Sequence, residues 1–150
     1  MKILSVALPI LISTFAMAEE CVFDEKVFHD FARLYVDGHE GASLEGPGKF
    51  TASLNDLMVF VEGGGCAHLG ATVQVQGQRG ISESQLLDLV LMLYTEFGQW
   101  LAGAESLSES IHESRWSRYE GVYYFQVDSL TSLEAWLSEN GDLMVSFYVN

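Results

Sequence analysis

The sequence of 150 residues is poor in basic side chains. Seven Lys and Arg stand against 21 Asp and Glu, for a formal net charge of −14. Binding to nucleic acid or to anionic lipid depends on clusters of Lys and Arg, so we expect neither as a partner. An acidic surface favours encounter with basic molecules. The same acidity also suits a small protein that only has to stay in solution.

Motifs for catalysis and for metal binding are absent as well. The four His residues show no H-x-x-x-H spacing, and the sequence has no C-x-x-C, no G-x-S-x-G and no dinucleotide fingerprint. Glu62 is the carboxylate to watch, because it ends an apolar strand beside a glycine-rich loop, although a strand-end charge facing water explains it more simply. We therefore predict that the protein is not an enzyme and binds no metal or cofactor.

No apolar run is long enough to cross a membrane. The longest run, residues 3–15, follows Lys2 and contains Pro9, and it is shorter than the roughly 20 residues that a bilayer core requires. A charge, an apolar run and small residues up to Ala18 are the layout of a secretory signal peptide. We predict cleavage after Ala18, which leaves one soluble periplasmic domain over residues 19–150 without membrane contact.

Only two cysteines are present, Cys21 and Cys66. In an oxidising compartment they predict a disulfide. A catalytic pair of Cys66 with His68 is disfavoured, because side chains two residues apart on an extended segment point to opposite faces. The glycines at 63–65 then supply positive-φ or bulge positions in the loop between two strands.

The first half of the chain predicts a helix and three strands. Residues 24–38 place apolar side chains at helical spacing before Gly38. Residues 39–48 are turn-rich and need no regular structure. The next segments alternate as strands, with Asn55-Asp56 as a tight hairpin turn between the first two. They are KFTASL (49–54), LMVFVE (57–62) and LGATVQVQ (69–76).

A long helix follows over residues 82–103. Ser82 and Gln85 have capping-box spacing, and Gly103 suits the C-terminal cap. The stripe of apolar residues on this helix predicts that it covers the sheet; it consists of Leu86, Val90, Leu93, Phe97 and Leu101.

The last third predicts three more strands. They are GVYYFQV (121–127), LEAWLS (133–138) and LMVSFYVN (143–150), with Asn140-Gly141 as a hairpin signal before the last. Residues 132–139 also fit a short helix, since Thr131 and Glu134 have capping-box spacing, but a strand is favoured. The predicted fold is α+β: an antiparallel sheet of about six strands, as two three-stranded meanders, packed against one long helix, with an N-terminal helix.

The segment between the long helix and the next strand, residues 104–121, is polar and longer than most connections. It fits a loop that contacts a partner, with Trp116 as an aromatic anchor. It equally fits a second amphipathic helix whose Trp116 packs on the core. The residues predicted to contact a partner are Ser106, Ser108, Glu109, His112, Glu113 and Trp116, with His68 in support.

A small, exported, acidic chain with a signal peptide and the Cys21 and Cys66 pair resembles the periplasmic immunity proteins that bacteria carry against peptidoglycan-cleaving type VI secretion amidases. The resemblance implies an inhibitor that blocks the active site of a basic cell-wall hydrolase. No contact residue carries over from that family.

Two other classes of function stay open. A periplasmic small-ligand-binding domain would enclose a cavity between sheet and helix, lined by Phe60, Tyr94, Tyr124 and Trp136. An enzyme would need an acid-base pair around Glu62 and His68.

Overall fold

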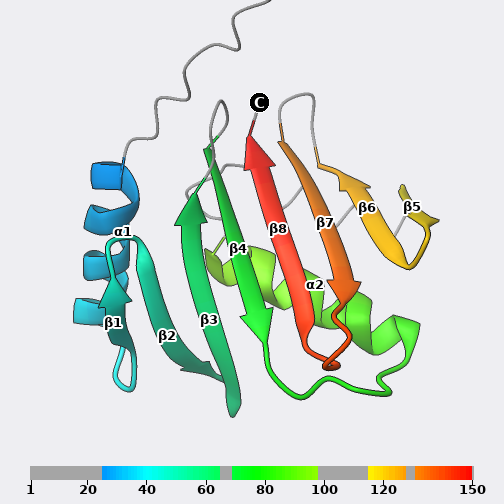
Figure 1. Ribbon diagram of the computed structural model, residues 1–150, viewed down its shortest axis with the longest axis horizontal. Coiled ribbons are helices and arrows are strands. Elements are labelled where there is room, and N and C mark those ends of the chain that lie inside the picture. Colours follow the sequence, from blue (N-terminus) through cyan, green and yellow to red (C-terminus); the bar gives the residue numbers. More distant parts are fainter. Residues whose placement is uncertain (1–24, 65–68, 98–114, 128–130, 150) are drawn as a thin grey trace, which may run out of the picture.

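The computed structural model describes residues 25–64, 69–97, 115–127 and 131–149. These residues form two helices and eight strands, and all eight strands belong to one antiparallel sheet (Figure 1). The predicted α+β class with an antiparallel sheet is therefore confirmed. The prediction of about six strands in two three-stranded meanders is wrong, because each meander has a fourth strand.

The helices are α1 (Glu25–Gly38) and α2 (Glu83–Phe97). The strands of the first meander are β1 (Ser43–Gly46), β2 (Lys49–Leu54), β3 (Leu57–Gly64) and β4 (Leu69–Val75), and those of the second are β5 (Trp116–Tyr119), β6 (Val122–Gln126), β7 (Thr131–Leu137) and β8 (Leu143–Val149). No helix in the described part of the chain combines the length and the apolar character that a membrane crossing requires.

The two meanders join at the centre of the sheet. The strand order is β1-β2-β3-β4-β8-β7-β6-β5, so β4 and β8 lie side by side and β1 and β5 form the edges. The central pair runs in register over seven residues of each strand, with Thr72 opposite Ser146 at its midpoint. This contact joins residues more than seventy positions apart in the sequence.

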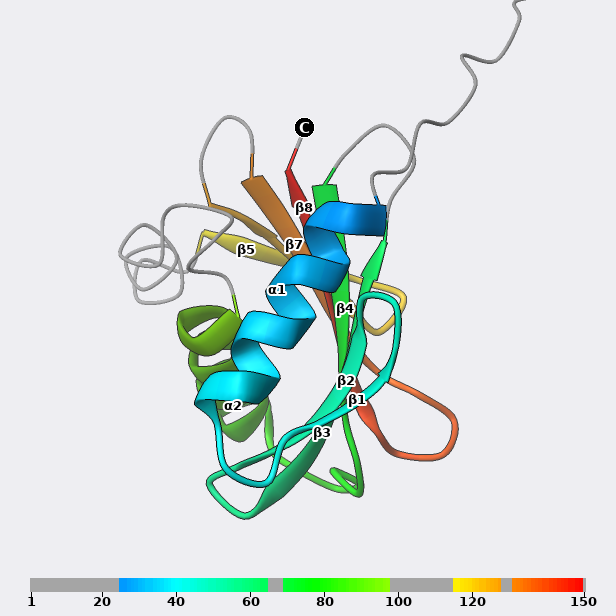
Figure 2. The same ribbon diagram turned by 90° about the vertical axis from the view of Figure 1, so that its left-hand side faces the viewer.

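Both helices lie on the same side of the sheet (Figure 2). Helix α1 packs at one edge, where the Tyr35 ring stacks on Phe50 of β2 at 4.7 Å between centroids. Helix α2 crosses behind the central strands, and its Tyr94 ring lies 5.7 Å from that of Phe147 in β8. The other side of the sheet carries no helix among the described residues.

The core lies between the helices and the sheet. Alternate residues of each inner strand point toward the helices and are buried, as the period of two in a strand requires. Among the described strand residues, eight side chains have no exposed surface: Val59, Val73, Val75, Leu133, Ala135, Leu143, Val145 and Phe147. Helix α2 contributes Leu86, Val90, Leu93, Tyr94 and Phe97, so four of the five residues of its predicted stripe are buried, and the fifth, Leu101, lies outside the described residues.

The predicted helices are confirmed, with adjustments at their ends. The capping box of α2 is present, since Ser82 N–H donates to Gln85 Oε1 at 2.8 Å and Gln85 N–H donates to Ser82 Oγ at 3.4 Å. The helix continues to Phe97, and its predicted remainder up to Gly103 lies outside the described residues. In α1, the apolar residue Leu34 is 74% exposed and does not join the core.

The predicted hairpin turns are also confirmed. Asn55 and Asp56 take φ values of 49° and 65° between β2 and β3, as a two-residue type I′ turn requires. Gly141 takes a φ of 84° between β7 and β8, and residues 131–137 form the strand that was favoured over a helix.

Two edge strands depart from the prediction. Residues 43–46, expected in a turn-rich segment without regular structure, form β1 and pair with β2. Residues 116–119 form β5 and pair with β6 rather than belonging to a loop or helix. Both strands are short and mostly exposed. They are strands because they pair with a neighbouring strand, and their sequences show little alternation of apolar and polar residues.

The glycines beside the predicted cysteine loop have a different role from the one expected. Gly63 and Gly64 continue β3, and neither has a positive φ. A Cβ added at Gly63 would overlap the Phe28 ring of α1, whereas a Cβ at Gly64 would meet no atom within 4 Å. Gly63 therefore permits close packing of α1 on the sheet. Gly65, Cys21 and Cys66 lie outside the described residues, so the disulfide stays a prediction.

Candidate functional site

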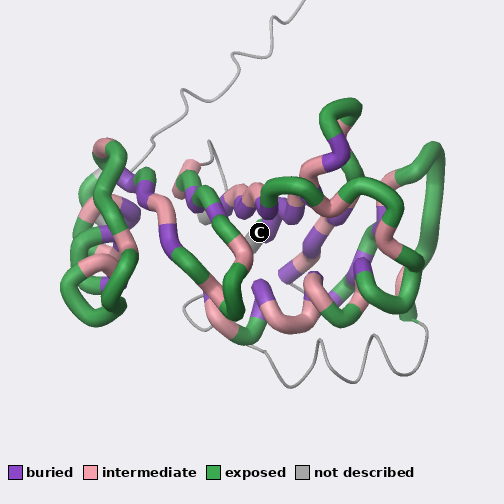
Figure 3. The backbone as a smooth tube through the Cα atoms, turned by 90° about the horizontal axis from the view of Figure 1, so that it is seen from below, coloured by how far each residue is buried: buried purple, intermediate pink, exposed green. Residues whose placement is uncertain are grey.

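The side of the sheet that faces away from the helices is the candidate site, and we call it the open face. Its side chains come from the alternate strand positions that do not enter the core. Towards one end of the face they are mainly apolar, and along its middle they are polar. Figure 3 views the sheet from below and shows buried and less buried residues alternating along the chain.

An apolar row crosses the open face at right angles to the strands. Phe60 of β3 lies opposite Gln74 of β4, Gln74 opposite Met144 of β8, and Met144 opposite Trp136 of β7. On the far side of Trp136 the row continues with Val122 of β6 and Tyr119 of β5, which are opposite each other. We define the apolar row as Phe60, Gln74, Met144, Trp136, Val122 and Tyr119, of which Gln74 alone has a polar amide or charged group.

The members of the apolar row are accessible. Phe60 is 36% exposed and Tyr119 66% exposed, and the neighbouring Met58 adds another exposed apolar side chain next to Phe60 on β3. Met144, Trp136 and Val122 are half-buried. None of these side chains belongs to the core cluster. Large apolar side chains that gather in one exposed band are typical of a binding surface.

A polar row lies beside the apolar row, nearer the other end of the strands. Thr72 and Ser146 hydrogen-bond through their hydroxyls at 3.1 Å where β4 meets β8. Glu62 is opposite Thr72 on the neighbouring strand β3, and Glu134 is opposite Ser146 on β7. Two carboxylates thus flank the central hydroxyl pair, one in each meander.

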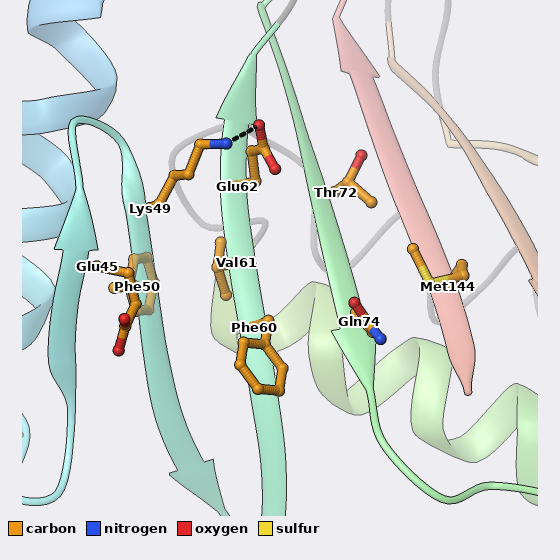
Figure 4. A pocket seen from close by; sticks show the side chains of 9 residues that line it. All are labelled: Glu45, Lys49, Phe50, Phe60, Val61, Glu62, Thr72, Gln74 and Met144. Carbon is orange, nitrogen blue, oxygen red and sulfur yellow. Dashed lines mark ion pairs between the residues drawn. The ribbon is translucent and has the colours of Figure 1, made fainter. Parts of the chain in front are cut away.

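A shallow hollow of about 250 Å³ spans part of both rows (Figure 4). Lys49 and Glu62 form an ion pair at its upper end, and Phe60, Gln74 and Met144 line it below. Both members of the ion pair are at least half exposed. Glu62 is thus a strand charge facing water with a cation beside it, and His68, with which it could form an acid-base pair, lies outside the described residues.

Acidic residues gather at the end of the sheet next to the apolar row. Strands β3, β6 and β8 run in the same direction, because each is separated from the next by one antiparallel neighbour. The turns that precede them consequently lie at one end of the sheet. These turns carry Asp56, Glu120, Glu139 and Asp142, which we call the acidic end. Arg79, in the connection between β4 and α2, reaches this end and donates from its guanidinium to the Asn140 carbonyl oxygen.

Asp142 of the acidic end also stabilises the local structure by accepting two hydrogen bonds. Its carboxylate accepts hydrogen bonds from Gln74 Nε2 at 2.9 Å and from the Gly77 backbone N–H at 3.0 Å. The first bond fixes the amide of Gln74 within the apolar row. The carboxylates of Asp56, Glu120 and Glu139 are on exposed residues.

Most residues predicted to contact a partner lie outside the described part of the chain: Ser106, Ser108, Glu109, His112, Glu113 and His68. Trp116 is described, and it starts β5 half-buried on the helix side of the sheet. Its ring lies 5.4 Å from that of Tyr123 and 6.5 Å from that of Phe125. Trp116 packs on the core, as the alternative interpretation of this segment expected, but it does so from strand β5 and not from the helix which that interpretation assumed.

The ligand cavity considered from the sequence is not formed. Tyr94 is fully buried on the helix side of the sheet, whereas Phe60, Tyr124 and Trp136 occupy strand positions on the open face. The sheet itself separates the first residue from the other three. The open face as a whole was not predicted from the sequence. Aromatic residues at strand positions that point away from the core would have indicated it.

Two buried tyrosines connect the layers, one joining the two helices to each other and the other joining α2 to the sheet. Tyr35 of α1 donates a hydrogen bond to Glu96 Oε1 of α2 at 2.8 Å, and Tyr123 of β6 donates one to Glu83 Oε2 at 3.1 Å. Burial, and secondarily these carboxylates, raises the pKa of Tyr35 and of Tyr123 above the usual range. Both phenols are therefore neutral donors with a structural role.

His39 extends the link between the helices. Its ring stacks on Tyr35 at 4.0 Å, and Nδ1 donates to the Tyr35 carbonyl oxygen at 2.8 Å. Within the described residues, no group of three or more His, Cys, Asp or Glu side chains is arranged to hold a metal ion.

No family model, no curated protein and no solved structure matches this chain. The function has to be inferred from the open face and the acidic end.

Proposed function

We propose that the protein is an exported binding protein that inhibits a basic periplasmic hydrolase by covering its active site with the open face of the sheet. The observation that carries the proposal is the apolar row, a band in which Phe60 and Tyr119 are exposed and Trp136 is half-buried, on a side of the sheet that no described helix covers. Aromatic side chains of this kind supply much of the energy of protein interfaces.

The expected chemistry of the partner follows from charge. The chain carries a net charge of −14, and the acidic end lies directly beside the apolar row. Opposite charges across an interface accelerate association and select partners. A basic protein, such as a cell-wall hydrolase effector, fits this surface better than an acidic one, and inhibition would be steric.

The shape of the open face also favours a protein over a small molecule. The hollow at Phe60, of about 250 Å³, and a second one of about 530 Å³ beside Tyr124 and Glu134 are both shallow and open to solvent, whereas a typical ligand pocket encloses most of the surface of its ligand. A row that crosses several strands offers contacts over a broad area instead. We therefore place the binding surface on the open face rather than on residues 106–116.

The test uses the mature chain, residues 19–150, as bait for proteins of the host's periplasmic and secreted fractions. Each captured protein is purified and assayed for hydrolysis of peptidoglycan with and without the bait. The expected result is a basic hydrolase whose activity falls to background at stoichiometric bait. The double variant Phe60→Ser/Trp136→Ser should lose both capture and inhibition.

Leu34→Ser is the matched control, because Leu34 is an exposed apolar residue of α1, away from the open face. It should capture and inhibit as the parent does. Inhibition that survives Phe60→Ser/Trp136→Ser, or a captured hydrolase whose activity is unchanged, would remove the proposal.

A further inference from the structure

We propose that the part of the partner that lies on the apolar row is a basic amphipathic α-helix, set across the strands with its cationic side toward the acidic end. This inference rests on the proposed function, and it specifies which structure the open face accepts. It follows from the backbone of the sheet, the length of the apolar row and the position of the acidic residues.

The backbone of the open face offers no hydrogen bonds to an incoming chain. The apolar row crosses the inner strands β4, β8, β7 and β6, which pair with neighbours on both sides. Their N–H and C=O groups therefore lie in the sheet and are used within it. An extended segment on the row would leave its own backbone groups unpaired against apolar side chains, at a cost for each. A helix satisfies its backbone internally.

The length of the apolar row suits one helix. The row runs over six neighbouring strands, from β3 to β5, and strands are spaced about 4.8 Å apart, which makes it about 24 Å long. A helix rises about 1.5 Å per residue, so about 16 residues would cover it. On its other side the same sheet already packs a crosswise helix, α2, of 15 residues.

The position of the acidic end indicates that the bound helix is positively charged and that its basic residues lie along the border that faces these carboxylates. Asp56, Glu120 and Glu139 are exposed in turns at the end of the sheet nearest the row. A basic side chain at this end is Arg79, whose guanidinium donates to the Asn140 carbonyl oxygen. A helix with apolar residues on one face and Lys or Arg along one border would bury the first on the row and bring the second to these carboxylates.

A second copy of this chain is the main competing occupant. Two open faces could stack as sheets do, about 10 Å apart. Each copy would then bring its own acidic end and its net charge of −14 to the contact, and like charges across an interface oppose association. The test therefore includes the oligomeric state.

The experiment measures binding of synthetic peptides to the mature chain by fluorescence anisotropy at low and at physiological salt. The probe is a labelled 18-residue Leu/Lys peptide with helical periodicity. One comparison peptide replaces every Lys by Glu, and another keeps the Leu/Lys composition in strict alternation, which favours a strand. We expect the helical Leu/Lys peptide to bind at least about tenfold more tightly than either comparison, a difference of about 1.4 kcal/mol.

Variants of the protein locate the contact. Phe60→Ala/Trp136→Ala should weaken binding of the helical Leu/Lys peptide at least about tenfold, and Asp56→Asn/Glu120→Gln/Glu139→Gln should weaken it most at low salt, where charges are least screened. Leu34→Ala should change nothing. Thermal unfolding of each variant establishes that it is folded before binding is compared.

Three results would overturn the inference: equal binding of the alternating peptide, unchanged binding by the Phe60/Trp136 variant, or a dimer in light scattering that this variant dissociates. These results are separable from failure of the proposed function. If a captured hydrolase depends on Phe60 and Trp136 while the helical peptide does not bind, the proposed function stands and the helix is wrong. If the peptide binds as expected but no hydrolase is inhibited, the helix-binding surface stands and the inhibitor role is wrong.

Discussion

The two faces of the sheet are built from the same strands but differ in chemistry. On the covered face, Val73, Val145 and Phe147 are fully buried against the helices. On the open face, their immediate neighbours in sequence are Thr72, Met144 and Tyr148, of which Tyr148 is 38% exposed. Each strand thus places residues that stabilise the fold on one side and residues available for binding on the other. Substitutions at adjacent positions can separate the two contributions.

The largest difference is expected between Phe147 and Tyr148 of β8. Phe147→Ala should lower the free energy of unfolding by about 3–5 kcal/mol, because a fully buried ring in contact with Tyr94 is replaced by a cavity. Tyr148→Ala should cost less than about 1 kcal/mol, since only cross-strand contacts are lost. Urea unfolding of both variants checks the pair, and equal losses would contradict the assignment of the faces.

Gly63 and Gly64 give a second adjacent pair on β3. Gly63→Ala should cost about 1–3 kcal/mol, because the added methyl group overlaps Phe28 and α1 has to move. Gly64→Ala adds a methyl group on the side where no atom lies within 4 Å, so it should cost less. Chemical denaturation measures both. A loss for Gly64→Ala as large as that for Gly63→Ala would show that the packing of α1 is not the cause.

The hydrogen bond that Tyr35 donates on the covered face predicts that the free energy of unfolding depends on pH. The pKa of Tyr35 is raised above its ordinary value of 10 by burial and then by Glu96. The folded state therefore keeps the proton that the unfolded state loses above about pH 10, and the free energy of unfolding should fall as pH rises beyond that value.

Tyr35→Phe tests this dependence. It should lower stability by about 1.5 kcal/mol at pH 7 through loss of the bond to a carboxylate, and it should flatten the decline between pH 9 and pH 11. Tyr119→Phe, at an exposed position, is the control. Urea midpoints across this range provide the measurement, and an unchanged slope in Tyr35→Phe would contradict the assignment.

The smallest effect is expected at the centre of the open face. Thr72→Val removes the hydroxyl that pairs with Ser146 and should cost about 0.2–1 kcal/mol. Because Ser146 is buried, Thr72→Val/Ser146→Ala should be less destabilising than the sum of the single changes. A double-mutant cycle gives the coupling energy, and strict additivity would mean that the hydroxyl pair contributes nothing.

Motifs made of neighbouring residues were sufficient to predict the helices and turns that contain them. The capping box at Ser82, the turn at Asn55-Asp56 and the apolar stripe of α2 depend on neighbouring residues, and the structure contains each of them. Strands β1 and β5 could not be found in this way, because short exposed edge strands need no alternation of their own. Their backbone is ordered by β2 and β6.

The candidate site was less predictable than the fold. Phe60 and Trp136 lie in one row only because β4 pairs with β8 in a particular register, and no local pattern specifies a contact across so much sequence. The sequence indicated a partner-binding segment at residues 104–121 instead, because that segment is polar and longer than most connections. Within it the structure describes residues 115–121, and Trp116 lies on the core side of the sheet.

The pairing of β4 with β8 also determines when the sheet can be completed. Strand β8 follows every other described strand in the chain, yet it lies between β4 and β7 at the middle of the sheet. During synthesis the two meanders can begin to form separately, but each exposes an unpaired inner strand until residues 143–149 emerge from the ribosome. Until this last strand is available for pairing, the chain therefore stays open to unfolding and to binding by chaperones.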